Sequence, residues 1–285
     1  MPTNPHGEVH RQREVAESFG ADAERYDRAR PRYPEILVER IVAGSPGSPG
    51  SPGSPGSPGL DVLDVGAGTG IAARQFQALG CRVAGVEPDP RLAVQARRFG
   101  LAVDVATFED WDPAGRRYDA VVAAQAWHWI DPVAGAAKAA RVLRPGGRLA
   151  AFWNVFRLPA AVADAIDGVC RRVVPDAPFG FRAVLTGAVD GYQAVFAKTS
   201  DGIRGAGGFG EPEQWRFDWE WTYTRDAWLD QMPTLGAFTR LPQDRMAEVL
   251  DGAGTAIDAM GGGFTMDYAT VAISAVRTGT GARRP

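Results

Sequence analysis

The stretch LDVLDVGAGTG, residues 60–70, joins an apolar run to a glycine-rich turn. Residues 60–66 have the composition of a buried strand, and residues 71–80 predict a helix directly after the turn. Glycine permits positive φ and lets a ligand approach the backbone. The N-terminus of the helix adds free N–H groups and the positive end of the helix dipole. The stretch therefore predicts a ligand-binding strand–turn–helix unit, with a merely tight turn as the alternative.

Strand and helix patterns continue to alternate after this unit. The expected strands are 81–87, 101–107, 118–124, 148–153, 213–224 and 264–277. The helices expected in the first half of this series are 90–100 and 131–143. Strands that alternate with helices predict a parallel, doubly wound sheet with right-handed crossovers. The predicted fold class is therefore α/β.

Five parts are expected along the chain. They are an N-terminal helical lid, a linker, a Rossmann-like core, a helical cap inserted after the fifth strand, and the C-terminal part of the sheet with a tail, at residues 1–44, 45–59, 60–158, 159–212 and 213–285. Alternating charged and apolar residues predict two short amphipathic helices over 8–30, broken at Gly20, and a third over 34–42. The linker repeats SPG five times, and we expect it to be mobile because it cannot bury apolar surface.

Composition excludes several classes of partner. The net charge of −3 gives no electrostatic reason to expect nucleic acid. The two cysteines, Cys81 and Cys170, form no metal-ligand spacing and no disulfide framework, so no metal site is predicted. The sequence shows no apolar signal-peptide region and no run that could span a bilayer, so we expect a cytoplasmic protein without a membrane partner. The sequence does not predict the oligomeric state.

The spacing of the glycines bears on the ligand. Gly66, Gly68 and Gly70 form G-x-G-x-G, and Ile71 stands where a dinucleotide fingerprint would have its third glycine. Asp64, at the end of the strand, would place a negatively charged carboxylate where a dinucleotide places its pyrophosphate, and the two would repel each other. A ligand with a cationic amine suits this turn better. A nicotinamide-dependent reductase is therefore disfavoured, and the chain also lacks a Tyr-x-x-x-Lys pair.

Several ordered segments together resemble the class I S-adenosylmethionine (SAM)-dependent methyltransferases, over roughly residues 18–155. The segment DVGAGTG resembles the first motif of the family, and Glu87 matches the acidic residue that binds both ribose hydroxyls. Residues 106–109, ATFE, fall where the family packs the adenine, although Thr107 stands where the third motif often has aspartate. Residues 143–147 match the L-x-P-G-G turn before strand five. The lid sequence FGADAERYDRARPRYP, followed later by WHW after strand four, resembles the small-molecule (methyltransferase type 11-like) branch.

This resemblance implies a Rossmann-like sheet of seven strands whose last strand is antiparallel. It also implies transfer of a methyl group from SAM to a small organic acceptor by direct displacement. The cofactor-binding residues expected from it are Tyr26, Arg32, Asp64, Gly66, Ala67, Gly68, Gly70, Glu87, Pro88, Thr107, Phe108, Glu109, Gln125 and Trp127. The residues expected near the acceptor are Tyr33, Trp129, Trp153 and Asn154. For Trp153 the alternative is a place in the core, and the lid residues could instead only fasten the lid.

His128 lies between two tryptophans beyond the fourth strand, while the other two histidines, His6 and His10, lie in the N-terminal tail. It could hold a ligand by a hydrogen bond, pack as structure, or act as a general base, since its ordinary pKa of about 6.5 suits that work. We rank positioning first, structure second and base third. The ligands of open α/β sheets bind beyond the carboxyl ends of the strands, which favours contact with the site.

Two other functions compete with methyl transfer. A catalytically silent SAM-binding protein would carry the same cofactor motifs, and a nicotinamide-dependent reductase would share the topology. A nucleic-acid methyltransferase would usually show a basic face or an Asn-Pro-Pro-Tyr-like motif after strand four, where this chain has AQAWHW. The residues do not identify the acceptor or distinguish O-, N- and C-methylation.

Overall fold

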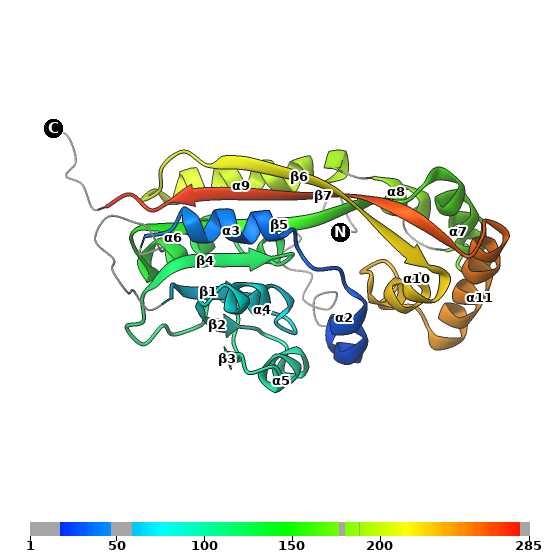
Figure 1. Cartoon of the computed structure of the whole chain (residues 1–285), viewed down its shortest axis with the longest axis horizontal. Coiled ribbons are helices and arrows are strands. Elements are labelled where there is room, and N and C mark those ends of the chain that lie inside the picture. Colours follow the sequence, from blue (N-terminus) through cyan, green and yellow to red (C-terminus); the bar gives the residue numbers. More distant parts are fainter. Residues whose placement is uncertain (1–17, 47–58, 177–179, 188, 280–285) are drawn as a thin grey trace. The chain divides into compact units, whose positions relative to one another are not determined.

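The computed structural model describes residues 18–46, 59–176, 180–187 and 189–279 (Figure 1). The chain divides into two compact units, which we describe one at a time. The unit that we call the core comprises Arg32–Trp153, Ala194–Phe217 and Val271–Pro285. The unit that we call the accessory unit comprises Met1–Pro31, Asn154–Gln193 and Asp218–Thr270. Most of the SPG repeat and the first part of the expected 8–30 helices lie outside the described residues.

One sheet of seven strands has the order β3-β2-β1-β4-β5-β7-β6. The strands are β1 Asp61–Val65, β2 Arg82–Val86, β3 Ala102–Asp104, β4 Tyr118–Ala124, β5 Leu143–Arg157, β6 Glu213–Thr224 and β7 Gly263–Val276. The first five strands pair in parallel, as the alternation of strands and helices predicts. The doubly wound, Rossmann-like class is therefore confirmed.

The last strand runs against its neighbour β5. The backbone N–H of Gly146 donates to the carbonyl of Arg277, and Arg277 donates back to Gly147. Further along β5, Asn154 accepts a hydrogen bond from Thr270. Residue numbers therefore rise along β5 as they fall along β7, which confirms the expected antiparallel last strand. The pairing also explains why β5 runs from 143 to 157 and not only over the expected 148–153, because β7 supplies partners along its length.

Helices of the core pack on the sheet through small and branched residues. They are α3 Glu35–Ala43, α4 Ile71–Ala78, α5 Pro90–Arg98, α6 Pro132–Val142 and α9 Gln193–Ala206. On one face, α3 and α4 share an apolar cluster with strand residues that include Val62, Val122 and Phe152 (Figure 1). Asp89 and Asp131 accept backbone N–H bonds at the starts of α5 and α6, each with proline in the first turn. These caps fix where each chain segment turns after its strand.

The accessory unit combines helices with parts of strands β5, β6 and β7, and it has its own apolar cluster. Its helices are the short helices η2 Phe19–Asp22, η4 Val189–Tyr192 and η5 Met232–Thr234, and the α-helices α2 Ala23–Ala29, α7 Ala160–Val173, α8 Phe181–Thr186, α10 Arg225–Gln231 and α11 Gln243–Ala259. Helix α7 packs against α8 and α11. The helical pattern expected over 159–212 is present in α7, α8 and α9, although α9 groups with the core.

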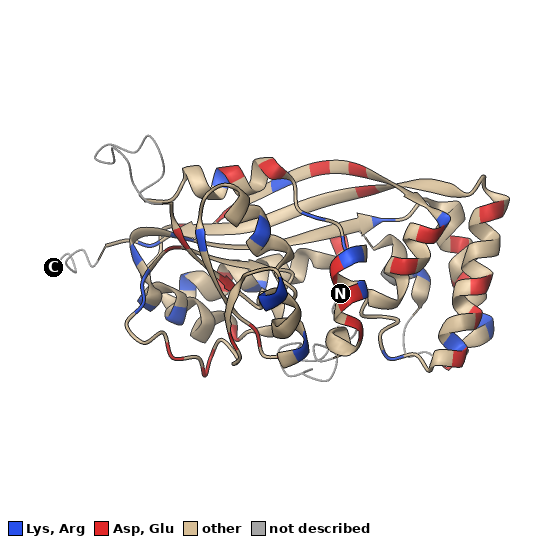
Figure 2. Cartoon of the chain, turned by 60° about the horizontal axis from the view of Figure 1, so that its bottom comes forward, with Lys and Arg blue, Asp and Glu red and all other residues tan. Residues whose placement is uncertain are grey.

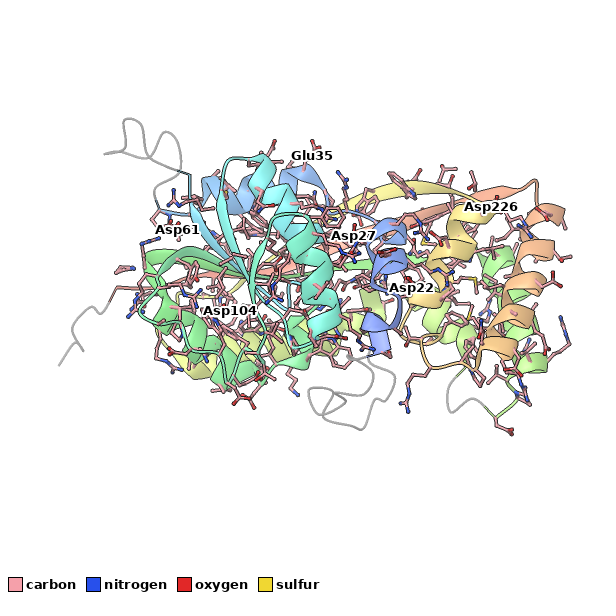
Figure 3. The ribbon with its side chains drawn as sticks, turned by 90° about the horizontal axis from the view of Figure 1, so that it is seen from below. Asp22, Asp27, Glu35, Asp61, Asp104 and Asp226 are labelled. Atoms are coloured by element: carbon pink, nitrogen blue, oxygen red, sulfur yellow. The ribbon has the colours of Figure 1, made fainter. Side chains whose placement is uncertain are left out.

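The N-terminal helix α2 is fastened within the accessory unit. Asp22 caps its first turn by accepting from the Arg25 backbone N–H (Figure 3). Arg28 makes two hydrogen bonds of 2.8 Å to the carboxylate of Asp230 on α10. Arg30 donates to the hydroxyl and the carbonyl of Thr234. The lid region thus has specific partners, in line with a segment that must hold a defined position.

Charge is spread without a dominant sign. Figure 2 shows acidic and basic residues mixed along the visible helices of each unit, in keeping with the small net charge. Within the described ranges, every helix is too short or too polar to cross a bilayer. The same ranges hold no group of three or more His, Cys, Asp or Glu side chains arranged to hold a metal ion.

Candidate functional site

The glycine-rich turn after β1 is held against the end of β2. The backbone N–H groups of Gly66 and Ala67 donate to the carbonyl of Val86 at 2.8 and 3.1 Å. Gly70 donates to the carbonyl of Ala67 at 2.8 Å, which closes the turn before α4 begins. All three glycines of the turn have positive φ, between 56° and 84°. The turn is therefore a fixed backbone structure that requires glycine.

Two of these glycines are needed for different reasons. A Cβ at Gly66 would lie 2.4 Å from the Cβ of Ala126, in the loop after β4. Gly66 therefore lets these two loops touch. A Cβ at Gly68 would meet no heavy atom within 4 Å. The space beside Gly68 is open, so a ligand can approach the backbone there.

Glu87, at the end of β2, faces this turn. Its carboxylate accepts hydrogen bonds from the backbone N–H of Gly68 at 2.8 Å and of Asp89 at 2.9 Å, one on each oxygen. Burial raises the pKa of Glu87 to about 7, against the lowering effect of these two hydrogen bonds. A carboxylate oxygen can accept a second hydrogen bond, so Glu87 keeps capacity for two further donors. Pro88 beside it is exposed.

Asp64 lies in β1, directly before the turn, and is fully buried. Neither of its carboxylate oxygens accepts a hydrogen bond from the described residues. Burial raises the pKa of Asp64 to about 7, and the charge of Glu87 adds to the rise. The backbone N–H of Ala73 in α4 lowers the pKa of Asp64 slightly, although it does not form a hydrogen bond of normal geometry with the carboxylate. A buried polar group without a partner is costly, so this carboxylate marks a place where a donor or a cation is expected.

The segment after β3 forms a tight turn. Asp104 ends the strand (Figure 3) and accepts from the indole N–H of Trp111 at 2.7 Å. The Thr107 hydroxyl donates to the Asp110 carboxylate at 2.8 Å and accepts from the Asp110 backbone N–H at 3.2 Å. Glu109 accepts from the backbone N–H of Asp131 at 3.1 Å, at the start of α6. The side chains of Thr107 and Glu109 therefore shape this loop in addition to any contact with a ligand.

Two aromatic residues expected at the cofactor are buried together. The Phe108 ring stacks on Trp111, with centroids 6.1 Å apart, and lies 6.3 Å from the Trp127 ring. Trp127 is only 1% exposed, and its indole N–H has no hydrogen-bond partner among the described residues. A Cβ at Gly135 in α6 would lie 3.5 Å from the Trp127 ring. Both rings therefore pack beneath the loop that follows β3. Their contact with a cofactor stays a prediction.

Lys138 is a member of this region that the sequence did not reveal. It is one of two lysines in the chain, and its side chain is buried. Its ammonium donates to the backbone carbonyls of Glu109 and Trp111. Burial lowers its pKa. The rarity of lysine in this arginine-rich chain was the one signal that could have singled it out.

The chain leaves β4 in an unusual conformation. Gln125 has φ 58°, and it is one of two described non-glycine residues, with Ala114, whose φ is positive. Its backbone N–H donates to the carbonyl of Phe152 in β5 at 2.8 Å. Left-handed backbone in a residue with a side chain stores strain, and such residues cluster at functional sites. Gln125 directly precedes Ala126, which touches the glycine turn, and its place at the cofactor stays a prediction.

His128 is held by a neighbouring strand. The indole N–H of Trp153 donates to Nδ1 of His128 at 3.0 Å. The ring of Trp129 lies 4.7 Å from the imidazole, centroid to centroid. Burial keeps the pKa of His128 well below its ordinary value. Trp153 is itself fully buried, and its ring lies 5.5 Å from Phe196 of α9. Trp153 therefore fits the core alternative and reaches the site through His128.

The remaining predicted residues fall in different places. Tyr33, in the core, exchanges backbone hydrogen bonds with the Gln75 amide and packs its ring edge-on against Phe152. Arg32 precedes it and is exposed. Tyr26 and Asn154 belong to the accessory unit, where the Arg30 guanidinium lies 4.9 Å from the Tyr26 ring centroid. Roles for these four residues at the cofactor or acceptor stay predictions.

Comparison with known proteins agrees with this geometry. Residues 63–151 match a family described as a methyltransferase domain. An uncharacterized methyltransferase of Mycobacterium tuberculosis is 36% identical over 145 residues, which cover 50% of this chain and 54% of that protein. A ubiquinone biosynthesis O-methyltransferase of Xanthomonas oryzae pv. oryzae is 36% identical over 115 residues, 37% of this chain and 47% of that protein.

A solved structure is similar over a longer span. A proposed type II methyltransferase from Anaeromyxobacter dehalogenans has 25% sequence identity and a TM-score of 0.58, covering 86% of this chain and 97% of that chain. The chain spans about half the length of the curated relatives that it matches. The strand order and the matched domain together define a class I methyltransferase fold. Through the methyltransferase domain over residues 63–151, the chain is similar to the class I SAM-dependent methyltransferases.

Proposed function

We propose that this protein transfers a methyl group from SAM to a small organic acceptor by direct displacement. The single observation that carries the proposal is Asp64, a buried carboxylate without a hydrogen-bond partner among the described residues, beside the open space at Gly68. A dinucleotide would bring a pyrophosphate to this turn, and its charge would repel Asp64. SAM is cationic at its amine and at its sulfonium, so its charge is complementary.

The residues present fit this cofactor. Glu87 has one free acceptor position on each oxygen, which suits the two adjacent hydroxyls of a ribose. Asp64 would stabilise the cationic amino-acid end. Gly68 would admit the cofactor against the backbone because it has no side chain. When bound, SAM supplies an electrophilic methyl group whose transfer leaves a neutral thioether.

What the protein contributes is position and exclusion of water. Because the turn is tied to β2 through Val86 and to the β4 loop through Ala126, its geometry is fixed before a ligand arrives. Holding the nucleophile, methyl and sulfur in line supplies much of the rate of such a displacement. A closed site also strengthens the interactions of Asp64 and Glu87, because less water screens them.

A small organic acceptor is supported by two points. The net charge of −3 is small for a chain of this size, and both signs are mixed along the helices visible in Figure 2, which gives no electrostatic reason to expect a nucleic acid. One similar protein, from Xanthomonas, is named as an O-methyltransferase of ubiquinone biosynthesis, and ubiquinone is a small molecule. We also propose the cytoplasm as the place of action.

Calorimetry of the purified full-length protein tests the cofactor assignment. We expect SAM and S-adenosylhomocysteine to bind with low-micromolar or tighter affinity, and NAD to bind far more weakly. Tighter binding of NAD than of SAM would refute the assignment. Incubation of the enzyme with labelled SAM and a small-molecule cell extract then tests transfer. Tight SAM binding without any labelled product would support the silent SAM-binding alternative.

A further inference from the structure

His128 and Trp153 form a pair whose chemistry is constrained by the donor. An indole has one polar atom, Nε1–H, and it can only donate. Because Trp153 Nε1 lies 3.0 Å from His128 Nδ1, Nδ1 must be the acceptor and must carry no proton. A neutral imidazole then has its only proton on Nε2. Trp153 is fully buried, so its indole cannot easily turn to another partner.

The other ring nitrogen is left for a ligand. No described residue hydrogen-bonds Nε2 of His128, and the side chain is only partly buried. The residue lies in the short helix η3 Trp127–Trp129, beyond the carboxyl end of β4. Ala126, two residues earlier, touches the glycine turn at Gly66. The free Nε2–H is therefore at the same edge of the core sheet as Asp64 and Glu87.

We propose that Trp153 fixes His128 as a neutral hydrogen-bond donor through Nε2–H, so that His128 positions the methyl acceptor and does not remove a proton from it. This inference rests on the proposed methyl transfer. Burial supports it, since a His128 with a pKa well below its ordinary value stays neutral at physiological pH. Trp153 is then a positioning residue that acts through His128.

The donor role restricts the class of acceptor. A neutral amine has one lone pair, and a hydrogen bond to it would block the attack. An ionised oxygen has several lone pairs, so it can accept from Nε2–H and still attack the methyl group. The nucleophile would therefore be a carboxylate or a phenol acidic enough to ionise unaided. One oxygen lone pair forms the new C–O bond, the C–S bond breaks with its electrons passing to sulfur, and no proton moves.

Nitrogen-15 NMR of the histidine side chains tests the tautomer directly, on full-length protein without any acceptor. Only three histidines are present, and His6 and His10 serve as internal references. A His128→Gln variant assigns the His128 signals by their loss. We expect His128 to keep the neutral Nε2–H pattern well below pH 6.5, where an ordinary imidazole would already be half protonated. An Nδ1–H tautomer, or an imidazolium at neutral pH, would overturn the proposal.

Two further variants separate the indole donor from mere packing. In Trp153→Phe an aromatic ring remains, although it is smaller, and the N–H donor is lost, so we expect His128 to lose its single tautomer and to titrate at higher pH. Trp129→Phe is the matched control, because Trp129 also touches the imidazole but donates nothing to it, and its His128 spectrum should match the wild type. Equal spectra in both variants would show that Trp153 does not set the tautomer. The wild-type spectrum decides the main point even if Trp153→Phe does not fold.

Turnover of a panel of carboxylates and phenols with labelled SAM tests the acceptor class. We expect His128→Phe to lower kcat/KM roughly 10-fold or more on ionised acceptors, and His128→Gln to restore part of it because an amide N–H can donate. The wild-type rate should rise with the ionised fraction of each phenol. Methylation of amines in preference to both oxygen classes would contradict the proposal. SAM binding measured alongside keeps this outcome distinct from failure of the cofactor assignment.

Discussion

Replacing Asp64 by asparagine should change how the stability of the ligand-free protein depends on pH. Burial raises the pKa of Asp64 from 3.8 to about 7, so the folded state binds a proton that the unfolded state releases above about pH 4. Stability therefore falls as pH rises between about 4 and about 7, and it changes little further above that. A rise of about three pKa units, at about 1.4 kcal/mol each, sets an upper limit of about 4 kcal/mol.

Urea unfolding of the ligand-free protein at about pH 5 and about pH 8 measures this effect. The wild type should lose several kcal/mol of unfolding free energy between the two pH values, since Glu87, with its pKa also raised to about 7, adds to the change from Asp64. Asp64→Asn should lose substantially less. Asp61→Asn is the matched control in the same strand, because the Asp61 carboxylate is partly exposed and paired with Arg82 and Arg144 (Figure 3).

Two results would refute this reasoning. A wild-type stability that is equal at both pH values would show that the Asp64 carboxylate carries no burial cost. An equal loss in Asp64→Asn and in the wild type would show that another group is responsible. If both carboxylates also hold the cofactor, the affinity for SAM should rise with pH through about 7, because their charged forms bind a cation and accept hydrogen bonds.

Four further outcomes follow from the same site. Glu87→Ala should weaken SAM binding by about 1–3 kcal/mol in calorimetry, because two ribose hydroxyls lose their acceptor, and unchanged affinity would remove Glu87 from the site. Gly66→Ala should lower the unfolding free energy by about 1–3 kcal/mol, since its Cβ would lie 2.4 Å from Ala126. Gly68→Val should lower the unfolding free energy by about 1–3 kcal/mol, because a φ of 56° is strained for a β-branched residue. It should also abolish SAM binding, because its side chain would fill the open space beside the turn; a folded variant that still binds SAM would place the cofactor elsewhere. Amide exchange across residues 18–33 should slow on addition of S-adenosylhomocysteine if the N-terminal helices order on binding, and identical protection would count against a lid.

The sequence was most informative for the mostly apolar strands of the parallel part of the sheet. Strands β1, β2 and β4 lie within one or two residues of their predicted ranges, because strands covered on both faces are rich in Val, Leu and Ala, which marks them against the helices and turns. The ends of β5 were not predictable. Its residues 143–147 have the composition of a turn, and they join the strand because Leu143 pairs with Tyr118 of β4 and because Gly146 and Gly147 share backbone hydrogen bonds with Arg277, directly after β7 and more than a hundred residues later. A strand edge defined by a distant partner leaves no local signal.

The same distinction holds in the site. Asp64 and Glu87 stood out because a carboxylate within or at the end of an apolar strand is unusual, and both are buried beside the turn. Phe108 and Trp127 could not be placed, because an aromatic residue near a site has the same pattern whether it lines the ligand or the core. The packing that buries them depends on Lys138 and Gly135 of α6. The hydrophobic periodicity of that helix does not show that these two residues contact the aromatic rings.

The hydrogen bond between Trp153 and His128 links the order of the strands to the position of the proton on the His128 ring. In the parallel pairing of β4 and β5, Ala123 lies opposite Ala151 and Ala124 opposite Phe152. The next residues along both strands therefore emerge together at the carboxyl edge, which brings Trp153 within reach of the helix that carries His128. The expected order of the strands already places these two segments side by side. What it lacks is the register, and one residue of slip would turn the indole to the opposite face of the sheet. The tautomer of His128, and with it the choice between donor and base, therefore depends on the register of two strands and not on any motif in the chain.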